Sequence, residues 1–278
     1  MLRLHGWLSI SMLGRPSTAA RRFAPAVSSA GRAGCGTMVR MMSLSETIAC
    51  ADPVLDVAQA VVMAKSLYRT GPAFRRKMQQ LRPYTCPFDV LVSLVPENAS
   101  VLDVGCGSGL FLGLAMLSGR CNTGVGVDIS ETAIRMAMAM RQDGLKPEQR
   151  ARLTFQLVRS DNDWPSTTFD VVSLTDVLHH ERPERRTALF DTAASRVRPG
   201  GILLYKDMCC RPLWRALLNW FQDLVVRHEW IRHCPVADIE AAARKAGFSE
   251  LRAETINRLG YGHELRVFMR PTLLGTGR

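Results

Sequence analysis

From Ser100 onward, short apolar runs rich in β-branched residues alternate with longer stretches whose apolar residues recur at helical spacing. The short runs predict five strands, at Ser100–Val104, Thr123–Asp128, Leu153–Val158, Phe169–Leu174 and Ile202–Tyr205. The stretches between them predict helices at Phe111–Leu117, Glu131–Gln142 and Glu184–Val197. Strands and helices that alternate in this way predict a parallel sheet covered by helices on both faces.

Residues typical of helix ends and turns support these predicted boundaries. Ser130 stands at the N-cap position of the helix at 131, where its hydroxyl can accept a hydrogen bond from a first-turn amide. Gly144 follows the last predicted turn of that helix, a position that favours glycine. The Pro-Gly-Gly sequence at 199–201 ends the next crossover and leads into the strand at Ile202.

Further elements flank the predicted sheet on both sides in the sequence. Residues 43–98 form an N-terminal helical region, with helices expected at Val54–Tyr68, Phe74–Leu81 and Phe88–Val95. After the fifth strand we expect helices at Leu213–Ile231 and Val236–Ala246, then strands at Leu251–Ile256 and Glu264–Met269. The loop between these last strands is too short for a helical crossover, so they should pair antiparallel. Residues 99–278 form the main domain.

A glycine-rich turn follows the first predicted strand, in the sequence VLDVGCGSGL at 101–110. Gly105, Gly107 and Gly109 permit a tight turn and allow backbone amides to approach a ligand at the start of the next helix. The dinucleotide fingerprint G-x-G-x-x-G requires a glycine where Leu110 stands. The turn therefore predicts a ligand site but lacks the dinucleotide pattern.

Carboxylates stand near this turn in the predicted fold. Asp128 ends the second strand, 23 residues after Gly105, where a carboxylate can bind both hydroxyls of a ribose; a solvated strand end is the alternative. Asp103 lies in an otherwise apolar strand and needs a partner when ionised, which a cationic ligand would supply. Asp161 and Asn162 follow the third strand, where a carboxylate and an amide could bind an adenine edge.

Together these motifs resemble class I S-adenosylmethionine-dependent methyltransferases. The resemblance rests on VLDVGCGSG, on Asp128 and Asp161 after their strands, on FDVVSLTDVLHH and on RVRPGG, and it covers about 88–269. Within the class, the chain is most similar to the small-molecule branch that includes ubiquinone and menaquinone biosynthesis methyltransferases. The resemblance implies an α/β fold with a Rossmann-like, seven-stranded, mostly parallel sheet, an antiparallel last strand, helices on both faces and a small N-terminal helical cap.

The resemblance also implies S-adenosyl-L-methionine as the cofactor and assigns its contacts. Asp103 and the glycine turn would hold the methionyl part beside Thr175, and Asp128 would bind the ribose. Ile129 would cover the adenine ring, and the residues at 161–162 would meet its amino group, although the loop there is one residue shorter than the family pattern. The implied cofactor-binding residues are Asp103, Gly105, Gly107, Gly109, Asp128, Ile129, Asp161, Asn162 and Thr175.

Methyl transfer from a sulfonium is an in-line displacement, so positioning of the acceptor supplies most of the catalysis. A protic acceptor also needs a group that removes its proton. The catalytic candidates are Asp176, His180 and Asp207, at the ends of the fourth and fifth strands. His179, Lys206, Tyr261 and His263 are secondary candidates, and packing is the alternative role for the histidines. The spacing of histidines and cysteines predicts no metal site.

The composition bounds the class of protein. The chain has 278 residues, 47% of them hydrophobic, and a net charge of +11, which raises the question of nucleic-acid binding. Six arginines and no acidic residue fall within residues 1–45, so six of the eleven excess charges lie in this leader and the remainder is only mildly basic. Residues 1–42 are either a disordered organelle transit peptide, which would place the protein in the mitochondrial matrix, or an over-extended start of a cytoplasmic protein.

The expected acceptor is a small, hydrophobic or aromatic molecule. The predicted helix at Leu213–Ile231 is apolar over more than one stripe; core packing is the first explanation, and a lipophilic acceptor pocket or peripheral membrane contact is the alternative. No stretch is long enough to span a membrane, and the eight cysteines are expected to be reduced. An RNA- or protein-directed methyltransferase and a non-catalytic binding protein are the alternatives. No nucleic-acid partner is expected, and the oligomeric state is not predicted.

Overall fold

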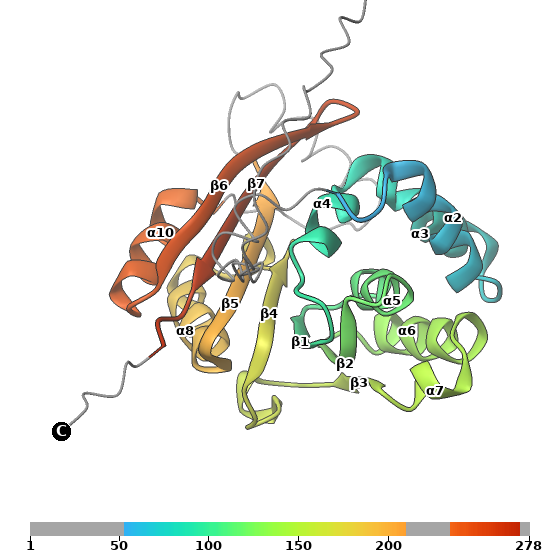
Figure 1. The fold of residues 1–278 in the computed structure, drawn as a ribbon, viewed down its shortest axis with the longest axis horizontal. Coiled ribbons are helices and arrows are strands. Elements are labelled where there is room, and N and C mark those ends of the chain that lie inside the picture. The colour runs from blue at the N-terminus through green and yellow to red at the C-terminus, as the bar shows by residue number, and fades with distance from the viewer. Residues whose placement is uncertain (1–52, 210–233, 273–278) are drawn as a thin grey trace, which may run out of the picture. The chain divides into compact units, whose positions relative to one another are not determined.

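A computed structural model of the chain describes residues 53–209 and 234–272 (Figure 1). The leader at 1–42 and the predicted helix at Leu213–Ile231 lie outside the described residues. The described part contains a seven-stranded sheet in the order β3-β2-β1-β4-β5-β7-β6. The strands are β1 Ala99–Val104, β2 Cys121–Asp128, β3 Leu153–Leu157, β4 Phe169–Thr175, β5 Val197–Met208, β6 Ser249–Arg258 and β7 Tyr261–Met269.

The strand directions confirm the predicted fold class. β1 to β5 pair parallel with one another, whereas β7 pairs antiparallel with both β5 and β6. The antiparallel hairpin expected after the last crossover is thus confirmed. Because the chain passes from β3 across the sheet to β4, the strand order reverses beside β1, where ligands of open α/β sheets bind beyond the carboxyl ends of the strands.

Helices cover both faces of the sheet. On one face lie α2 Val57–Leu67, α3 Ala73–Thr85, α4 Phe88–Ser93, α5 Leu110–Leu117 and α6 Glu131–Gly144, with the short α7 Pro147–Arg150 at the edge (Figure 1). On the other face lie α8 Pro183–Ser195 and α10 Val236–Lys245. Each face has its own apolar core, with Leu204 and Val267 in the first and Leu203 and Phe268 in the second, as strand alternation requires.

Several boundaries differ from prediction for local reasons. α2 begins at Val57 instead of Val54 because the Asp56 carboxylate caps it, accepting the Gln59 amide at 2.7 Å. α3 continues to Thr85, through the buried Pro83, and its last turn closes with the Cys86 amide donating to the Arg82 carbonyl at 2.9 Å.

The start of β5 is another difference. The strand begins at Val197, within the predicted crossover helix, because Val197 already pairs with Phe169 before an irregularity that contains the Pro-Gly-Gly sequence. Gly200 there has a φ of +76°, a conformation that favours glycine. Gly144 is the last residue of α6 and does not follow it; a Cβ at this position would lie 2.6 Å from the Leu67 backbone, so close helix packing requires the glycine.

Two compositional predictions can be compared with the described part of the chain. Cys86, Cys106 and Cys121 are free and buried, and Cys209 and Cys234 are buried, whereas Cys35, Cys50 and Cys210 lie outside the described residues. Within residues 53–209 and 234–272, no helix has the length and hydropathy needed to cross a bilayer.

Candidate functional site

The three glycines after β1 have different physical roles. A Cβ at Gly105 would lie 2.6 Å from Val177, and one at Gly109 would lie 2.5 Å from the Phe155 ring, so both positions are required by packing. At Gly107 a Cβ would meet nothing within 4 Å, although its φ of +55° also favours glycine. Gly107 is therefore the position of the turn where the backbone faces open space that a ligand can enter.

Asp128 is held against this turn at the end of β2. Its Oδ2 accepts the Gly107 amide at 2.8 Å, and its Oδ1 accepts the Ser130 amide at 2.8 Å. Ser130 also caps α6, as predicted, by accepting the Ala133 amide at 3.3 Å. The carboxylate is thereby oriented at the carboxyl edge of the sheet, and a carboxylate oxygen has lone pairs for further donors.

Asp103 lies one strand away from Asp128 and is almost fully buried, with 2% of its surface exposed. The pKa of Asp103 is raised to about 7: burial is the largest cause and Asp128 adds to it, whereas a Ser173 hydrogen bond and the Arg82 charge oppose the shift. A carboxyl group in this state gains from a cation placed beside it.

The remaining predicted cofactor residues lie along the same edge. Ile129 exposes 74% of its surface beside Asp128. Thr175 ends β4, with its hydroxyl 2.9 Å from that of Ser173. Asp161 and Asn162 begin the short 3-10 helix η1 Asp161–Asp163. The Asp161 carboxylate faces α8 there, 3.8 Å from an Arg185 nitrogen and within 3.4 Å of the Thr192 hydroxyl.

A second polar cluster lies at the ends of β4 and β5. Lys206 Nζ, with the residue only 1% exposed, lies 2.6 Å from Asp176 Oδ1, and the Arg82 guanidinium lies 3.2 Å from Asp176 Oδ2. Burial alone would raise the pKa of Asp176, but Lys206 and Arg82 hold it well below its ordinary value. The φ of Asp176 is +58°, a rare conformation for a residue other than glycine. The predicted catalytic Asp176 is therefore an ionised anchor of two cations.

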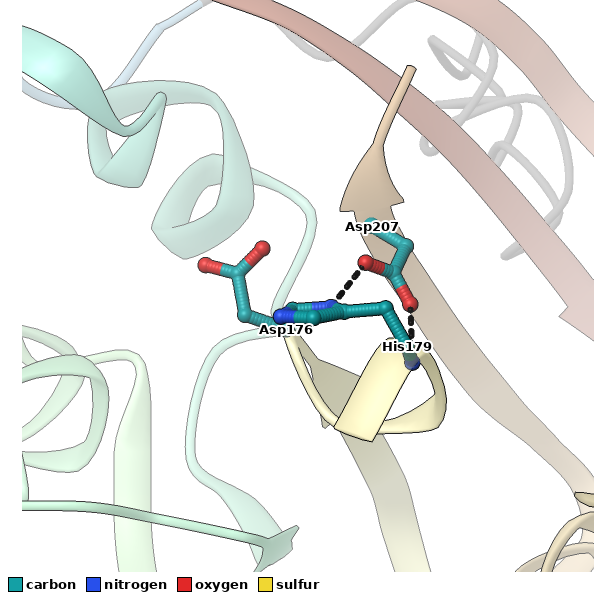
Figure 2. A group of neighbouring side chains, drawn as sticks. All are labelled: Asp176, His179 and Asp207. Carbon is teal, nitrogen blue, oxygen red and sulfur yellow. Dashed lines mark hydrogen bonds and ion pairs between the residues drawn. The ribbon is translucent and has the colours of Figure 1, made fainter. Parts of the chain in front are cut away.

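Asp207 follows Lys206 on β5, so its side chain points to the other face of the strand. There it is paired with His179 (Figure 2). His179 Nδ1 lies 2.5 Å from Asp207 Oδ1, and the carboxylate also accepts the amides of His179 at 3.3 Å and Met208 at 2.7 Å. The structure thus places His179, in the 3-10 helix η2 Leu178–His180, against Asp207. The predicted His180 lies next to it, with the two imidazole centroids 3.9 Å apart.

Asp176, His179 and Asp207 each offer a ligand-type atom, and these atoms lie within 4.8 Å of one another. In Figure 2 the imidazole lies between the two carboxylates. The Lys206 ammonium on Asp176 already supplies a cation to this group. The group is therefore charge-compensated by side chains of the chain itself.

His263 on β7 completes the cluster from the far side. It pairs in register with Met208 on β5 and is 3% exposed, and its Nε2 lies 2.8 Å from the Thr85 carbonyl, so this nitrogen carries the proton and donates it. Burial and the Lys206 charge lower the pKa of His263 to about 3. Its Nδ1 is therefore a neutral, buried hydrogen-bond acceptor, and it has no partner.

The N-terminal helices contribute residues that the sequence did not assign to the site. The Tyr68 hydroxyl, at the end of α2, donates to the Ser108 carbonyl of the glycine turn at 2.8 Å. From α3, Arg82 binds Asp176 and Thr85 binds His263. The available signals were a tyrosine and an arginine upstream of the glycine turn, but their partners are 40 and 94 residues away in sequence.

Comparison with known proteins identifies the family. A family model described as "Methyltransferase domain" matches residues 73–252, which include α3 and most of the sheet. A ribosomal protein L11 methyltransferase from Xanthomonas campestris pv. campestris is 30% identical over 141 residues, 49% of this chain and 42% of that protein. The chain thus spans about two fifths of that relative's length.

Two further proteins are similar over longer stretches. A ubiquinone biosynthesis O-methyltransferase from Xanthomonas axonopodis pv. citri is 26% identical over 199 residues, 69% of this chain and 77% of that protein. The crystal structure of magnesium protoporphyrin IX methyltransferase from Synechocystis PCC 6803 with bound SAH superposes with a TM-score of 0.55 at 22% identity, covering 75% of this chain and 93% of that chain. This last likeness shows a shared fold.

Three findings support the same family. The glycine turn lies where the strand order reverses, β7 runs antiparallel, and the family model matches residues 73–252. The chain belongs to the methyltransferase domain family.

Proposed function

We propose that this protein transfers the methyl group of S-adenosylmethionine to a small, hydrophobic or aromatic acceptor, and that the edge formed by β1, β2 and β4 binds the cofactor. The observation that carries the proposal is the Asp128 carboxylate, held by the Gly107 and Ser130 amides beside the open space at Gly107. A ribose offers two hydroxyl donors, which suit an oriented carboxylate at a strand end.

The residues present fit this cofactor. Asp103 would bind the methionyl ammonium, since a buried carboxyl group with a raised pKa gains from a cation. Arg82, one quarter exposed and near Asp103, would bind the methionyl carboxylate with the guanidinium nitrogens that Asp176 leaves available. Ile129 would cover an adenine face, as its exposure allows. The role of Asp161 and Asn162 at the adenine amino group would require Asp161 to turn from α8.

The cofactor, when bound, supplies a sulfonium methyl group whose transfer needs little chemical assistance beyond orientation. The chain's own residues would position the acceptor and hold its proton. Asp176 and Asp207 already accept several N–H groups, which makes them positioning residues, and His180 lies beside the His179–Asp207 pair. The unpartnered Nδ1 of His263 is a neutral hydrogen-bond acceptor, but it is buried and would reach a hydroxyl or amine of the acceptor only if the site opened.

The small-molecule acceptor is supported by the similarity to the ubiquinone biosynthesis O-methyltransferase, which extends over most of both chains. A protein acceptor is a second candidate because of the similarity to ribosomal protein L11 methyltransferases, although that match covers less than half of each chain. Incubation of the full-length protein with methyl-labelled cofactor and fractionated cell extract distinguishes them. Label in an organic-soluble product identified by mass spectrometry supports the proposal; label only in protein or RNA favours the alternatives, and no transfer despite cofactor binding indicates a binding protein.

A predicted cytoplasmic location also remains part of the proposal, with the mitochondrial matrix as its alternative. Fluorescent fusions with and without residues 1–42 would distinguish the two, because a transit peptide directs import only when it is present.

A further inference from the structure

Helix α3 carries an unusual combination of exposed side chains. Its sequence, AFRRKMQQLRPYT, contains four basic residues and no acidic residue. Phe74 is 72% exposed, Tyr84 42% and Leu81 39%. Residues 74, 81 and 84 are seven and three positions apart, so they fall on one side of the helix. Lys77 lies on the same side, and Arg75 is exposed next to Phe74.

The inner side of α3 is occupied by the protein. The helix packs against α2, and Pro83 is its buried residue. Gln80 donates to the Tyr68 carbonyl at 2.8 Å, and Arg82 and Thr85 contact the site residues Asp176 and His263. The aromatic and aliphatic side chains at 74, 81 and 84 nevertheless remain exposed to solvent, so they are not core residues.

A helix with aromatic and leucine side chains among lysines and arginines is the type that lies in a membrane interface. The apolar side chains enter the boundary between headgroups and acyl chains, and the cations attract anionic lipids. Helix α10 differs in both respects: it carries Asp238 and Glu240 with its basic residues, and within the described part of the chain it exposes no large hydrophobic side chain.

We propose that the outer face of α3, formed by Phe74, Leu81 and Tyr84 with Arg75 and Lys77, docks the protein on membranes that contain anionic lipids. The four basic residues of α3, without an acidic residue among them, complement such a surface. Because the C-terminal end of α3 contacts the candidate site, docking places that site next to the bilayer, where a lipophilic molecule would be concentrated. The inference does not depend on methyl transfer, since lipid binding is measured without a cofactor.

Co-sedimentation of the full-length chain with vesicles tests the docking surface. Wild type should bind vesicles of phosphatidylcholine with phosphatidylglycerol and bind phosphatidylcholine alone weakly. The combined variant Phe74→Ser, Leu81→Ser and Tyr84→Ser should weaken binding to the anionic vesicles at least about tenfold. A matched control replaces three exposed apolar residues elsewhere, Met138→Ser, Leu157→Ser and Leu259→Ser, and should bind like wild type.

The charges are tested by a second matched pair, in which the arginine-rich leader stays intact. Arg75→Gln with Lys77→Gln should weaken binding about tenfold, whereas Arg244→Gln with Lys245→Gln on α10 removes the same charge and should change it less than about twofold. Circular dichroism confirms that each variant is folded. Equal vesicle binding by the apolar variant and its control would overturn the proposal. So would an RNA oligonucleotide that competes fully with vesicles, or a change of oligomeric state in the apolar variant without a change in lipid binding.

Discussion

Lys206 Nζ lies 2.6 Å from Asp176 Oδ1 in the interior of the protein, at the edge of the sheet that carries the candidate site. Lys206 comes from β5 and Asp176 from the end of β4, and Arg82 from α3 binds the second oxygen of Asp176. This three-residue contact joins the N-terminal helices to the sheet. It also explains how Asp176 is maintained with a positive φ, since both of its carboxylate oxygens are held.

We expect Asp176→Asn to destabilise the protein strongly. Loss of the carboxylate leaves the buried Lys206 ammonium without its partner, which costs about 3–5 kcal/mol in the free energy of unfolding. Lys206→Met should cost less, because Asp176 keeps Arg82. Urea denaturation measures both. The exposed pair Arg135–Glu131 provides the control, and Arg135→Gln should change stability by no more than about 0.5 kcal/mol. A loss below about 1 kcal/mol for Asp176→Asn would show that the pair is unimportant.

Gly107→Ala separates backbone strain from ligand contact. Gly107 and Gly119 both have positive φ, +55° and +74°, and a Cβ at either position meets no neighbour within 4 Å. Alanine at either position should therefore cost about 1–2 kcal/mol of stability. Only Gly107→Ala should also reduce cofactor affinity, by more than about tenfold, because its methyl group would occupy the space where the ligand approaches. Equal cofactor affinity in the two variants, measured by calorimetry, would place the ligand elsewhere.

The affinity for the cofactor should depend on pH through Asp103. Its pKa of about 7 in the free protein means that the carboxylate needed to bind an ammonium group forms only as the pH rises. The dissociation constant should therefore fall about tenfold between about pH 6 and pH 8. Asp103→Asn should bind weakly and show little pH dependence over this range. A wild-type affinity that stays constant from pH 6 to pH 8 contradicts the assignment.

His263 should make the folded protein less stable at acidic pH. Its pKa falls to about 3 in the folded protein, below its ordinary value, so the unfolded chain takes up a proton at higher pH than the folded chain. Stability is therefore lost as the pH falls from about 6.5 to about 3. Asp103 acts in the other direction, since its raised pKa favours the folded state at acidic pH.

Comparison of wild type with His263→Gln isolates the contribution of this histidine to the pH dependence of stability, because glutamine can still donate to the Thr85 carbonyl but does not titrate. The free energy of unfolding should fall less steeply in the variant, by a total on the order of 2–4 kcal/mol over this range. Parallel pH profiles of the two proteins would mean that His263 titrates normally.

The sheet was predictable from sequence because each strand is a short apolar run bounded by turn residues, and the short connection before Glu264 required an antiparallel pair. The place of Asp128 was also predictable, because the predicted parallel pairing brings the end of the second strand beside the glycine turn that follows the first. The boundaries of α3 and β5 were predicted less well. Pro83 suggested an end to a helix that in fact continues, and the Pro-Gly-Gly sequence suggested a connection where the chain already pairs as a strand.

The second polar cluster could not be predicted because packing of distant elements creates it. Arg82 and Asp176 are 94 residues apart, and Thr85 and His263 are 178 residues apart. The sequence marks His263 only as one histidine in a hairpin. The Thr85 carbonyl fixes the proton on Nε2, and burial and the charge of Lys206 keep the ring neutral, which leaves Nδ1 as an unpartnered acceptor. A local sequence pattern contains none of these causes.

Calorimetric titration of the full-length chain with S-adenosylhomocysteine and S-adenosylmethionine is the most direct test of the proposed site. The wild-type protein should show saturable binding of both molecules, and Asp128→Ala should weaken it more than about tenfold, since the variant loses the acceptor of the ribose hydroxyls. Unchanged affinity in Asp128→Ala, or no heat with either molecule while reduced pyridine nucleotides bind, would contradict the account.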